Sequence, residues 1–402
     1  MRLLVAGDPR SIHTARFIAL LTELRHDVHL FSTELDYRPD EQLRDVTIHV
    51  PLACWPINAA LRVEGAQHWT ASLCRTRVVQ RVVAKALYSH GAPGKVWRER
   101  SFARLAESLA PQLILSLKLQ NEGYTVARAR PLASRWAPWV HFSWGTDIEF
   151  FGKDPAHASR HLPLIREAYA ACDFHIADTR RDLEAAVALG FRGRSLGAMP
   201  ASGGFDIEWL QGLRARAPAR RDAILVKGRH GGYVGKALHV LEAIRRRPAV
   251  YRSYRIRVFM ATPEVAAAAR RLQQEQGLDC EALPRLAYDE LMAWYGRSLI
   301  AVSATDVDGT PAQLLEAMAM GAFPVHSDMA SLREWIEHGR NGLLFAVDDI
   351  DALGARMEQA LGDAGLRERG AAHNWSLIRE RADRVRLRAR LQEWIDSAAA
   401  AR

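Results

Sequence analysis

The most informative part of the sequence is Asp308-Gly-Thr-Pro-Ala-Gln-Leu-Leu-Glu316, which follows an apolar segment. Thr310 at the N-cap, Pro311 at the first helical position and Gln313 at the third predict a helix with a capping box. The free N–H groups and the positive dipole end of such a helix favour an anion, and Gly309 lets a phosphate approach the backbone closely. The stretch therefore predicts an anion site over this turn.

Two carboxylates bracket the helix start. Glu316 lies roughly 7 Å beyond Pro311 along the helix axis, because each helical residue adds about 1.5 Å. Asp308 stays in the loop on the ligand side, so one carboxylate can reach each end of a diphosphate-linked molecule. A well-capped helix in an ordinary α/β domain explains the same residues, and the rest of the chain has to distinguish the two interpretations.

The composition is that of a globular protein. The chain has 402 residues, of which 49 % are hydrophobic and 25 % charged, and this predicts two domains of about 200 residues each. The first residues do not resemble a signal peptide and no run of 18 apolar residues occurs, so a cytoplasmic location is expected. The cysteines Cys54, Cys74, Cys172 and Cys280 form no C-x-x-C pair, and buried thiols are predicted.

The net charge of +9 indicates an anionic partner. Between residues 75 and 104, arginines and lysines alternate with valine, leucine, tryptophan and phenylalanine. This pattern is typical of a helix lying on an anionic membrane, here the inner face of the cell membrane, although a solvated face of an ordinary helix explains it equally well. Nucleic acid is not expected, because no helix-turn-helix, zinc-finger or RNP pattern is present.

Strand and helix patterns alternate along the whole chain. Apolar strands are predicted at residues 2–6, 28–31, 113–117, 139–142 and 175–177, and again at 223–226, 256–260, 299–303 and 323–326. Such alternation predicts parallel sheets covered by helices on both faces. A linker-like segment follows residue 205, so the expected domains are 1–205 and 206–375, with the helical segment 376–402 packing back on the first.

A glycine-rich loop over residues 227–236 follows the first strand of the second domain. Arg229 can bind two diphosphate oxygens and Lys236 can act as a point charge, although solvated cations in a flexible loop are the alternative. A P-loop is excluded, because His230 stands where glycine is required and Ala237 where serine or threonine should hold magnesium. A dinucleotide-binding dehydrogenase is disfavoured, because no G-x-G-x-x-G follows the first strand.

Other polar residues follow predicted strands, where ligands of open parallel sheets collect. Asp306-Val-Asp308 has the spacing of a metal-binding D-x-D, but its place before a phosphate-type helix favours Asp308 as an acceptor of hydroxyl hydrogen bonds. Asp147, in Trp144-Gly-Thr-Asp147, is predicted either to face the cleft or to cap a helix near Phe150. His13 is placed to meet a substrate, and His141 is either near the acceptor or in the core. The position of the Leu283-Pro-Arg285 loop suggests base recognition.

Taken in chain order, these motifs resemble the retaining glycosyltransferases of family 4, glycosyl transferases group 1, and the likeness covers almost the whole chain. The most specific part is an acidic residue eight positions before a glutamate, Asp308 and Glu316 with seven residues between them, followed by Ala317-Met-Ala-Met-Gly321. The other matching positions are His13, Trp144-Gly-Thr-Asp147, Ile176-Ala-Asp-Thr179, Gly203-Gly204, Arg229 with Lys236, and Asn341-Gly-Leu-Leu344. The resemblance implies the GT-B fold, with two Rossmann-like domains facing across a cleft.

The family also implies roles for these residues. Glu316 would bind the ribose hydroxyls, Asp308 the donor sugar, and Arg229 with Lys236 the diphosphate. The donor side would further include Gly309, Thr310, Pro311, Ala312, Gln313, Arg285 and Gly204. The acceptor side would include Trp144, Gly145 and His141. The catalytic residues would be Asp308, Glu316, Asp147 and His13. Retention is thought to use the leaving phosphate oxygen as base, so neither metal nor another cofactor is expected.

The resulting hypothesis is a retaining, metal-independent hexosyltransferase. It would use a UDP- or GDP-linked sugar and a glycan or lipid-linked acceptor in bacterial envelope polysaccharide, lipopolysaccharide or glycolipid synthesis. Three features depart from the family. Asp308 stands where glutamate is commoner, and Trp144 stands where many members have a histidine. The interval from Arg229 to Lys236 is longer than usual. Two alternatives stay open, a sugar-nucleotide epimerase or hydrolase on the same architecture and a non-catalytic GT-B-like binding subunit.

Overall fold

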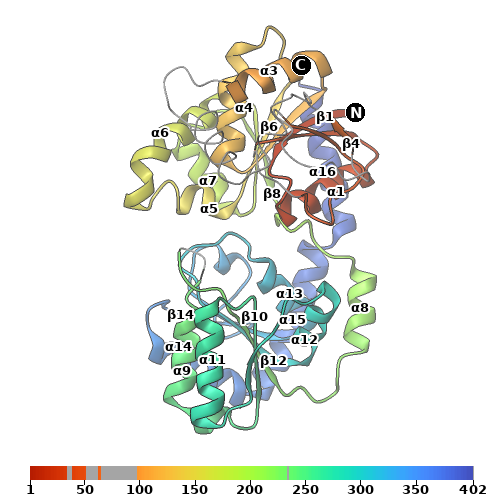
Figure 1. Ribbon diagram of the computed structural model, residues 1–402. Helices are drawn as coiled ribbons and strands as arrows, with labels where there is room; N and C mark the ends of the chain where they lie inside the picture. The colour runs from red at the N-terminus through yellow and green to blue at the C-terminus, as the bar shows by residue number, and fades with distance from the viewer. Residues whose placement is uncertain (34–38, 51–61, 65–96, 233–234, 402) are drawn as a thin grey trace. The chain divides into compact units, whose positions relative to one another are not determined.

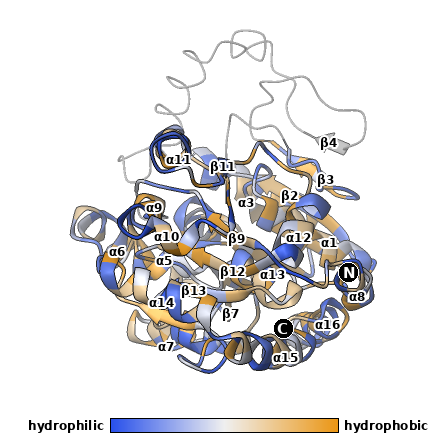
Figure 2. Cartoon of the chain, turned by 90° about the horizontal axis from the view of Figure 1, so that it is seen from below, coloured by the Kyte–Doolittle hydropathy of each residue, from blue (hydrophilic) through white to orange (hydrophobic). Residues whose placement is uncertain are grey.

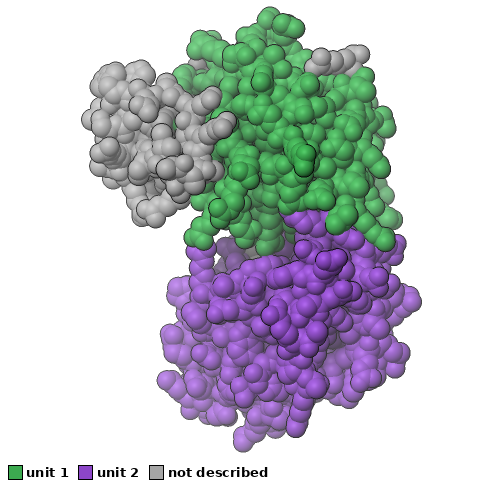
Figure 3. Space-filling view, turned by 90° about the vertical axis from the view of Figure 1, so that its right-hand side faces the viewer, with its two compact units in different colours: residues 1–203, 385–402 green, residues 204–384 purple. Residues whose placement is uncertain are grey.

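The computed structural model describes residues 1–33, 39–50, 62–64, 97–232 and 235–401. The chain divides into two compact units (Figure 3): unit 1 is Met1–Gly203 with Val385–Arg402, and unit 2 is Gly204–Arg384. Most of the basic segment 75–104 lies outside the described residues, as do Cys54 and Cys74. Cys172 and Cys280 are buried thiols, as predicted.

Unit 1 is built on an eight-stranded sheet in the order β4-β3-β2-β1-β5-β6-β7-β8 (Figure 1). All neighbouring strands are parallel. The strands are β1 (Arg2–Gly7), β2 (Asp27–Ser32), β3 (Thr47–His49), β4 (Arg62–Glu64), β5 (Leu113–Leu117), β6 (Trp139–Ser143), β7 (Phe174–Ala177) and β8 (Arg194–Ala198). The order reverses at β1, which pairs with β2 on one side and β5 on the other.

Helices cover both faces of this sheet. They are α1 (Ile12–Glu23), α3 (Trp97–Leu109), η3 (Leu119–Gly123), α4 (Tyr124–Ala129), η4 (Arg130–Leu132), α5 (Gly145–Glu149), α6 (Pro155–Ala171), α7 (Arg180–Ala188) and α16 (Arg384–Ala399). Successive side chains of a strand point to opposite faces. Leu3 and Val5 of β1 accordingly join the core under α1 and α16, and Leu4 and Ala6 join the core under α3 and α6.

The C-terminal helix α16 belongs to unit 1 over most of its length. Its buried side chains Leu387, Leu391 and Ile395 recur every four residues and so form one apolar stripe. A Cβ on Gly197 would lie 2.5 Å from the Trp394 ring, so only glycine lets β8 approach this helix. Residues 376–384, assigned to the first domain from the sequence, lie in unit 2 instead, partly within α15 (Ala364–Arg381).

Unit 2 contains a six-stranded parallel sheet in the order β11-β10-β9-β12-β13-β14. Its strands are β9 (Ala223–Lys227), β10 (Arg255–Phe259), β11 (Cys280–Ala282), β12 (Ser298–Ser303), β13 (Phe323–Ser327) and β14 (Leu343–Phe345). The helices are α8 (Ile207–Ala215), α9 (Ala237–Arg246), α10 (Pro248–Tyr251), α11 (Pro263–Gln276), α12 (Tyr288–Arg297), α13 (Ala312–Met320), η5 (Leu332–Glu334), α14 (Ile350–Gly362) and α15.

The strands of unit 2 are apolar on both faces because helices cover both. Ile224 and Val226 of β9 join the core with α9, α11 and α14, and Leu225 joins the core with α12 and α13. Figure 2 shows the contrast with the outer helices, where α9 and α11 carry blue, hydrophilic turns. The strand order reverses at β9, between β10 and β12. In an open parallel sheet such a reversal is where ligands bind, at the carboxyl ends of the strands.

Candidate active site

The helix start predicted over residues 308–316 lies at this reversal in unit 2. α13 begins at Ala312, with Pro311 at the N-cap position and no side-chain cap. Thr310 is buried and its hydroxyl accepts a hydrogen bond from Trp335 Nε1 at 3.4 Å. The predicted capping box is therefore wrong, because a tertiary contact engages Thr310. The first N–H groups of the helix still have no partner within it, so the turn keeps its preference for an anion.

Gln313 is held by His326 rather than by a cap. The amide nitrogen of Gln313 lies 3.0 Å from His326 Nε2, and His326 Nδ1 lies 3.2 Å from the carbonyl of Ser327. Because a carbonyl only accepts, Nδ1 carries the proton and Nε2 accepts from the Gln313 amide. Burial, and then the charge of Lys227, lower the pKa of His326 to about 3, so the ring is neutral near pH 7.

Asp308 is positioned by its backbone and stays partly exposed. Its Oδ1 accepts a hydrogen bond from Gly309 N at 2.9 Å, and its carbonyl accepts one from Ser331 Oγ at 2.9 Å. Its Oδ2 lies 3.9 Å from Lys227 Nζ, and the side chain is 30 % exposed. The carboxylate can therefore accept a hydrogen bond from a ligand hydroxyl while Lys227 balances its charge.

Glu316 is far less accessible than Asp308. It is 5 % exposed, within a helix whose residues from Gln313 to Met320 are all buried. It lies beside Tyr295, whose pKa is raised first by burial and then by the charge of Glu316. Glu316 therefore offers a ligand at most an edge of its carboxylate.

The three cations of the glycine-rich loop differ in what they contact. Lys236 Nζ lies 3.0 Å from Asp348 and 3.3 Å from Asp306, and these acids raise its pKa. Arg229 is exposed, and within the described part of the chain its side chain has no hydrogen-bond or ion-pair partner. Lys227 ends β9 beside Asp308. Lys227 and Arg229 are therefore better placed than Lys236 to receive an added anion.

Lys227 was not singled out from the sequence. The signal that could have found it is its position as the last residue of the central strand, at the reversal of strand order. Two further predicted donor residues lie in loops of unit 2. Arg285 is exposed in the segment after β11, and Gly204 is the first residue of the unit, with a left-handed φ of 73°.

In unit 1 the structure brings His13 and Trp144 together. His13, at the start of α1, packs edge-on against the Trp144 ring, with 5.5 Å between the ring centroids. Trp144 is the N-cap residue of α5, and Gly145 is the first, buried residue of that helix. The segments after β1 and β6 therefore meet at the carboxyl edge of this sheet.

Asp147 has a structural position. Its Oδ2 accepts hydrogen bonds from Trp144 N at 2.9 Å and Leu119 N at 2.8 Å, and the residue is 1 % exposed. Burial raises its pKa to about 7, against the lowering effect of these hydrogen bonds. The predicted catalytic role is therefore corrected to the alternative, a carboxylate that caps α5 and ties it to the segment after β5.

His141 is a core residue, which corrects its predicted place on the acceptor side. It is 1 % exposed, and its Nδ1 lies 2.8 Å from Ser116 Oγ. Its ring stacks on His175 with the centroids 5.7 Å apart and the planes 3° from parallel. A strand covered by helices on both faces leaves no side chain at this position for a substrate.

Lys118 and Glu122, after β5, were missed from the sequence. Lys118 has a left-handed φ of 68°, which is costly for a residue with a Cβ and is found at functional sites. Its Nζ lies 3.4 Å from the fully buried Glu122, which also accepts a hydrogen bond from Thr33 Oγ1 at 2.7 Å. Burial acts to raise the pKa of Asp8, after β1, but hydrogen bonds from Arg10 and then the charge of Lys118 lower this pKa below its usual value. These groups line the reversal point of unit 1.

The described residues contain neither a metal cluster nor a membrane-spanning helix. No group of three or more His, Cys, Asp or Glu side chains among them is placed to hold a metal ion. Within those ranges, no helix has both the length and the apolar character required to cross a bilayer.

Two doubly wound units with ligand-type loops at their strand reversals define the GT-B fold. The chain is similar over its whole length to sucrose-phosphate synthase of Thermosynechococcus elongatus, with a TM-score of 0.74, 14 % identity and 100 % of both chains covered. It is also similar to Anabaena HepE, determined with UDP and with UDP-glucose. For the UDP complex the TM-score is 0.66 and the identity 17 %, over 99 % of this chain and 100 % of that one.

The match to a family lies in unit 2. Residues 223–363 match the family described as glycosyl transferases group 1, in agreement with the resemblance that the motifs of this part of the chain indicated. An exopolysaccharide phosphotransferase of Streptomyces coelicolor is 29 % identical over 131 residues, which are 32 % of this chain and only 14 % of that relative.

Proposed function

We propose that the chain is a retaining hexosyltransferase that uses a UDP- or GDP-linked donor. The observation that carries the proposal is the start of α13, where unpaired helical N–H groups and Asp308 lie beside Lys227 at the strand reversal of unit 2, with the exposed Arg229 two residues further along the chain. The match to glycosyl transferases group 1 covers this region. The binding of UDP and UDP-glucose by HepE, which shares the fold, supports a nucleotide-sugar donor.

The donor would lie with its diphosphate over the first turn of α13. Helical N–H groups, Lys227 and Arg229 would neutralise the diphosphate, because charge-assisted hydrogen bonds are the strongest available to it. The partly exposed Asp308 would accept hydrogen bonds from the sugar hydroxyls. Glu316 would accept hydrogen bonds from the ribose through the edge of its carboxylate that remains accessible.

Transfer would occur on one face of the sugar. The bond from C1 to the donor phosphate oxygen breaks, and a bond from C1 to the acceptor oxygen forms on the same face. The acceptor proton passes to the leaving phosphate oxygen, so the diphosphate serves as both leaving group and base. The protein would supply electrostatic stabilisation through fixed N–H groups and cations, without a protein base or a metal ion.

The acceptor is proposed to be a glycan or a lipid-linked glycan of the bacterial envelope, bound by unit 1 near His13 and Trp144. The exopolysaccharide relative supports a polysaccharide acceptor. The basic segment 75–104 would hold the enzyme on the inner face of the cell membrane. Of its described part, Arg100 and Arg104 are exposed on α3, whereas Arg98 is buried. Flotation with anionic liposomes tests this, and protein that stays unbound at low salt excludes it.

The donor site is tested by titration with UDP, GDP and ADP sugars and by turnover assays. Arg229→Ala and Lys227→Met should each weaken donor binding about tenfold or more, because a hydrogen bond to a charged group contributes about 1.5–3 kcal/mol. Lys236→Met is the matched control and should cost less, because two carboxylates already neutralise Lys236. Glu316→Ala should abolish transfer while the chain stays folded.

Three outcomes would contradict the proposal. Turnover like that of the wild type in Glu316→Ala or Arg229→Ala would remove the assigned site. Rapid conversion of the donor without any acceptor would favour an epimerase or hydrolase. Tight donor binding without turnover across an acceptor panel would favour a binding subunit.

A further inference from the structure

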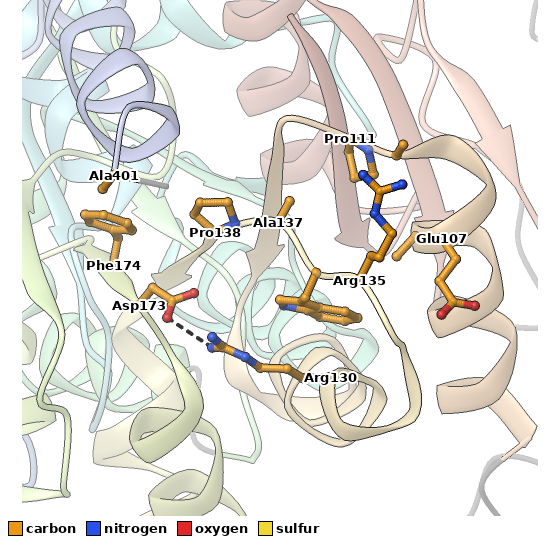
Figure 4. Close-up of a pocket in the computed structure, with 12 residues that line it drawn as sticks. Glu107, Pro111, Arg130, Arg135, Ala137, Pro138, Asp173, Phe174 and Ala401 are labelled. Carbon is orange, nitrogen blue, oxygen red and sulfur yellow. Dashed lines mark hydrogen bonds and ion pairs between the residues drawn. The ribbon is translucent and has the colours of Figure 1, made fainter.

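Unit 1 contains a cavity at the opposite edge of its sheet from His13 and Trp144. It lies where β5, β6 and β7 begin, and its walls come from the end of α3, from η4 and from the segments that lead into β6 and β7 (Figure 4). Its volume is about 670 Å³, within the range of small-molecule sites. Because ligands of the GT-B reaction belong to the carboxyl edges, this cavity is separate from the proposed donor and acceptor sites.

Both acids in the wall already have partners. Asp173 lies 3.1 Å from Arg130 Nη1, the pair joined by a dashed line in Figure 4, and it accepts a hydrogen bond from Trp139 N at 2.9 Å. Glu107 accepts hydrogen bonds from the N–H and the hydroxyl of Ser134 at 2.6 and 2.7 Å, and these lower its pKa. The acids therefore stabilise the wall and leave little capacity for a cationic ligand.

One charged donor in the wall lacks an acceptor. Arg135 is exposed and extends beside Pro111, away from the Arg130–Asp173 pair (Figure 4), and among the described residues its guanidinium has no hydrogen-bond or ion-pair partner. The Nε1–H of the neighbouring Trp136 is buried, so a ligand in the cavity does not reach it. A carboxylate in the cavity would therefore be bound by Arg135 through charge-assisted hydrogen bonds.

The remaining wall is apolar and flat. Trp136 is held against the core by Phe102, with ring centroids 6.0 Å apart, and Pro111, Pro138 and Phe174 complete the lining. Rigid rings of this kind suit a ring-shaped ligand. Within the wall the charges of Arg130 and Asp173 cancel and Glu107 is held by Ser134, so Arg135 offers one positive charge, which suits a monoanion.

We propose that this cavity binds a six-membered ring carrying a single carboxylate, with Arg135 on the carboxylate and the ring against the apolar wall. Acidic sugars and aromatic acids share this chemistry. The inference does not depend on the proposed transferase activity.

The test is calorimetric titration of the full chain with glucuronate and with benzoate, against glucose and benzamide as neutral counterparts. We expect saturable millimolar binding of at least one acid and none of its neutral counterpart. Arg135→Ala should weaken that binding at least tenfold, because it removes the cation that would hold the carboxylate. Arg166→Ala, an exposed arginine on α6 outside the cavity, is the control and should bind like the wild type.

Preference for glucuronate would identify the ligand class as acidic sugars, and preference for benzoate as aromatic acids; either supports the proposal. Far-ultraviolet circular dichroism of each variant establishes that it is folded. The proposal fails if neither acid binds the wild type at millimolar concentration, if the neutral counterparts bind equally, or if folded Arg135→Ala binds the acids unchanged.

Discussion

His141 and His175 place two imidazoles in the core of unit 1. Each donates to or accepts from one serine hydroxyl, Ser116 for His141 and Ser143 for His175, both at 2.8 Å. The second nitrogen of each ring is buried and has no hydrogen-bond partner among the described residues. Burial lowers the pKa of both rings, that of His175 to about 3, so both are neutral in the folded protein near pH 7.

This arrangement predicts acid sensitivity. An unfolded histidine has a pKa near 6.5, so each buried histidine contributes stability that is complete above this pH and is lost as the pH falls toward the folded pKa. The loss is about 1.4 kcal/mol per pH unit for one histidine. Urea unfolding of His175→Gln should therefore show about 2 kcal/mol less loss between pH 6.5 and 5 than the wild type.

The comparison must be made between variant and wild type at each pH. The raised pKa of Asp147 acts in the opposite direction, giving stability that is present below the unfolded pKa and lost as the pH rises through about 7. This contribution is common to both proteins and cancels in their difference. Equal losses in wild type and His175→Gln would show that His175 becomes protonated without unfolding the core.

At the scale of the element, α13 is fixed at its C-terminus by arginines. Arg214 donates to the carbonyl of Ala319, and Arg221 donates to the carbonyl of Met320 at 2.9 Å. Cations at this end complement the helix dipole. Burial, and then the charge of Arg214, lower the pKa of Arg221 to about 10. The helix thus has its carbonyl end satisfied by the protein and its N–H end available to a ligand.

Gly321 is the C-cap residue of α13. Its φ of 78° is left-handed, and a Cβ there would lie 3.0 Å from the Arg221 guanidinium, so Gly321→Ala should destabilise unit 2 by about 1 kcal/mol or more. Gly212→Ala in α8 is the matched control, because no atom lies within 4 Å of the added Cβ. It should stabilise by about 0.5–1 kcal/mol through helix propensity. Chemical denaturation measures both, and the same sign for both variants would contradict the argument.

At the scale of the whole molecule, each unit has its own sheet and its own pair of hydrophobic cores. The chain leaves unit 1 at Gly203 and returns to it at Val385, where α16 supplies the stripe of Leu387, Leu391 and Ile395 to the core that also contains α1. Unit 1 is therefore not formed by the first 203 residues alone, because that core would lack part of its cover.

Leu391→Ala should destabilise unit 1 by about 2–5 kcal/mol, the usual effect of truncating a fully buried leucine. Ala389→Ser, at an exposed position of the same helix, should change stability by less than about 0.5 kcal/mol. Hydrogen exchange resolved by peptide can assign the loss to β1 and α1. Equal loss of protection throughout unit 2 would show that the two units unfold together.

Much of the fold could be predicted from local patterns in the sequence. The period of apolar residues identified the central strands and predicted two parallel sheets, and the motif from Asp308 to Glu316 indicated the family that residues 223–363 match. Ligands of an open parallel sheet bind at the carboxyl ends of its strands, and the loop that follows each strand can be identified from the sequence. The loops that carry the candidate site could therefore be predicted too. Lys227 and Lys118 were missed because nothing local marks the strand at which a sheet reverses its order.

Residue type and spacing along the chain were enough to predict the α/β architecture with helices on both faces of each sheet, the likeness to glycosyl transferases group 1 and the helix start that favours an anion. The hydrogen-bond partners of individual polar side chains depend on the tertiary structure. Thr310 contacts Trp335, Gln313 contacts His326, and Asp147 binds Leu119 N, each across a separation in sequence that no local pattern encodes. The physical reason is that a buried polar group must be satisfied by whatever partner folding brings beside it, and that partner comes from another strand or loop.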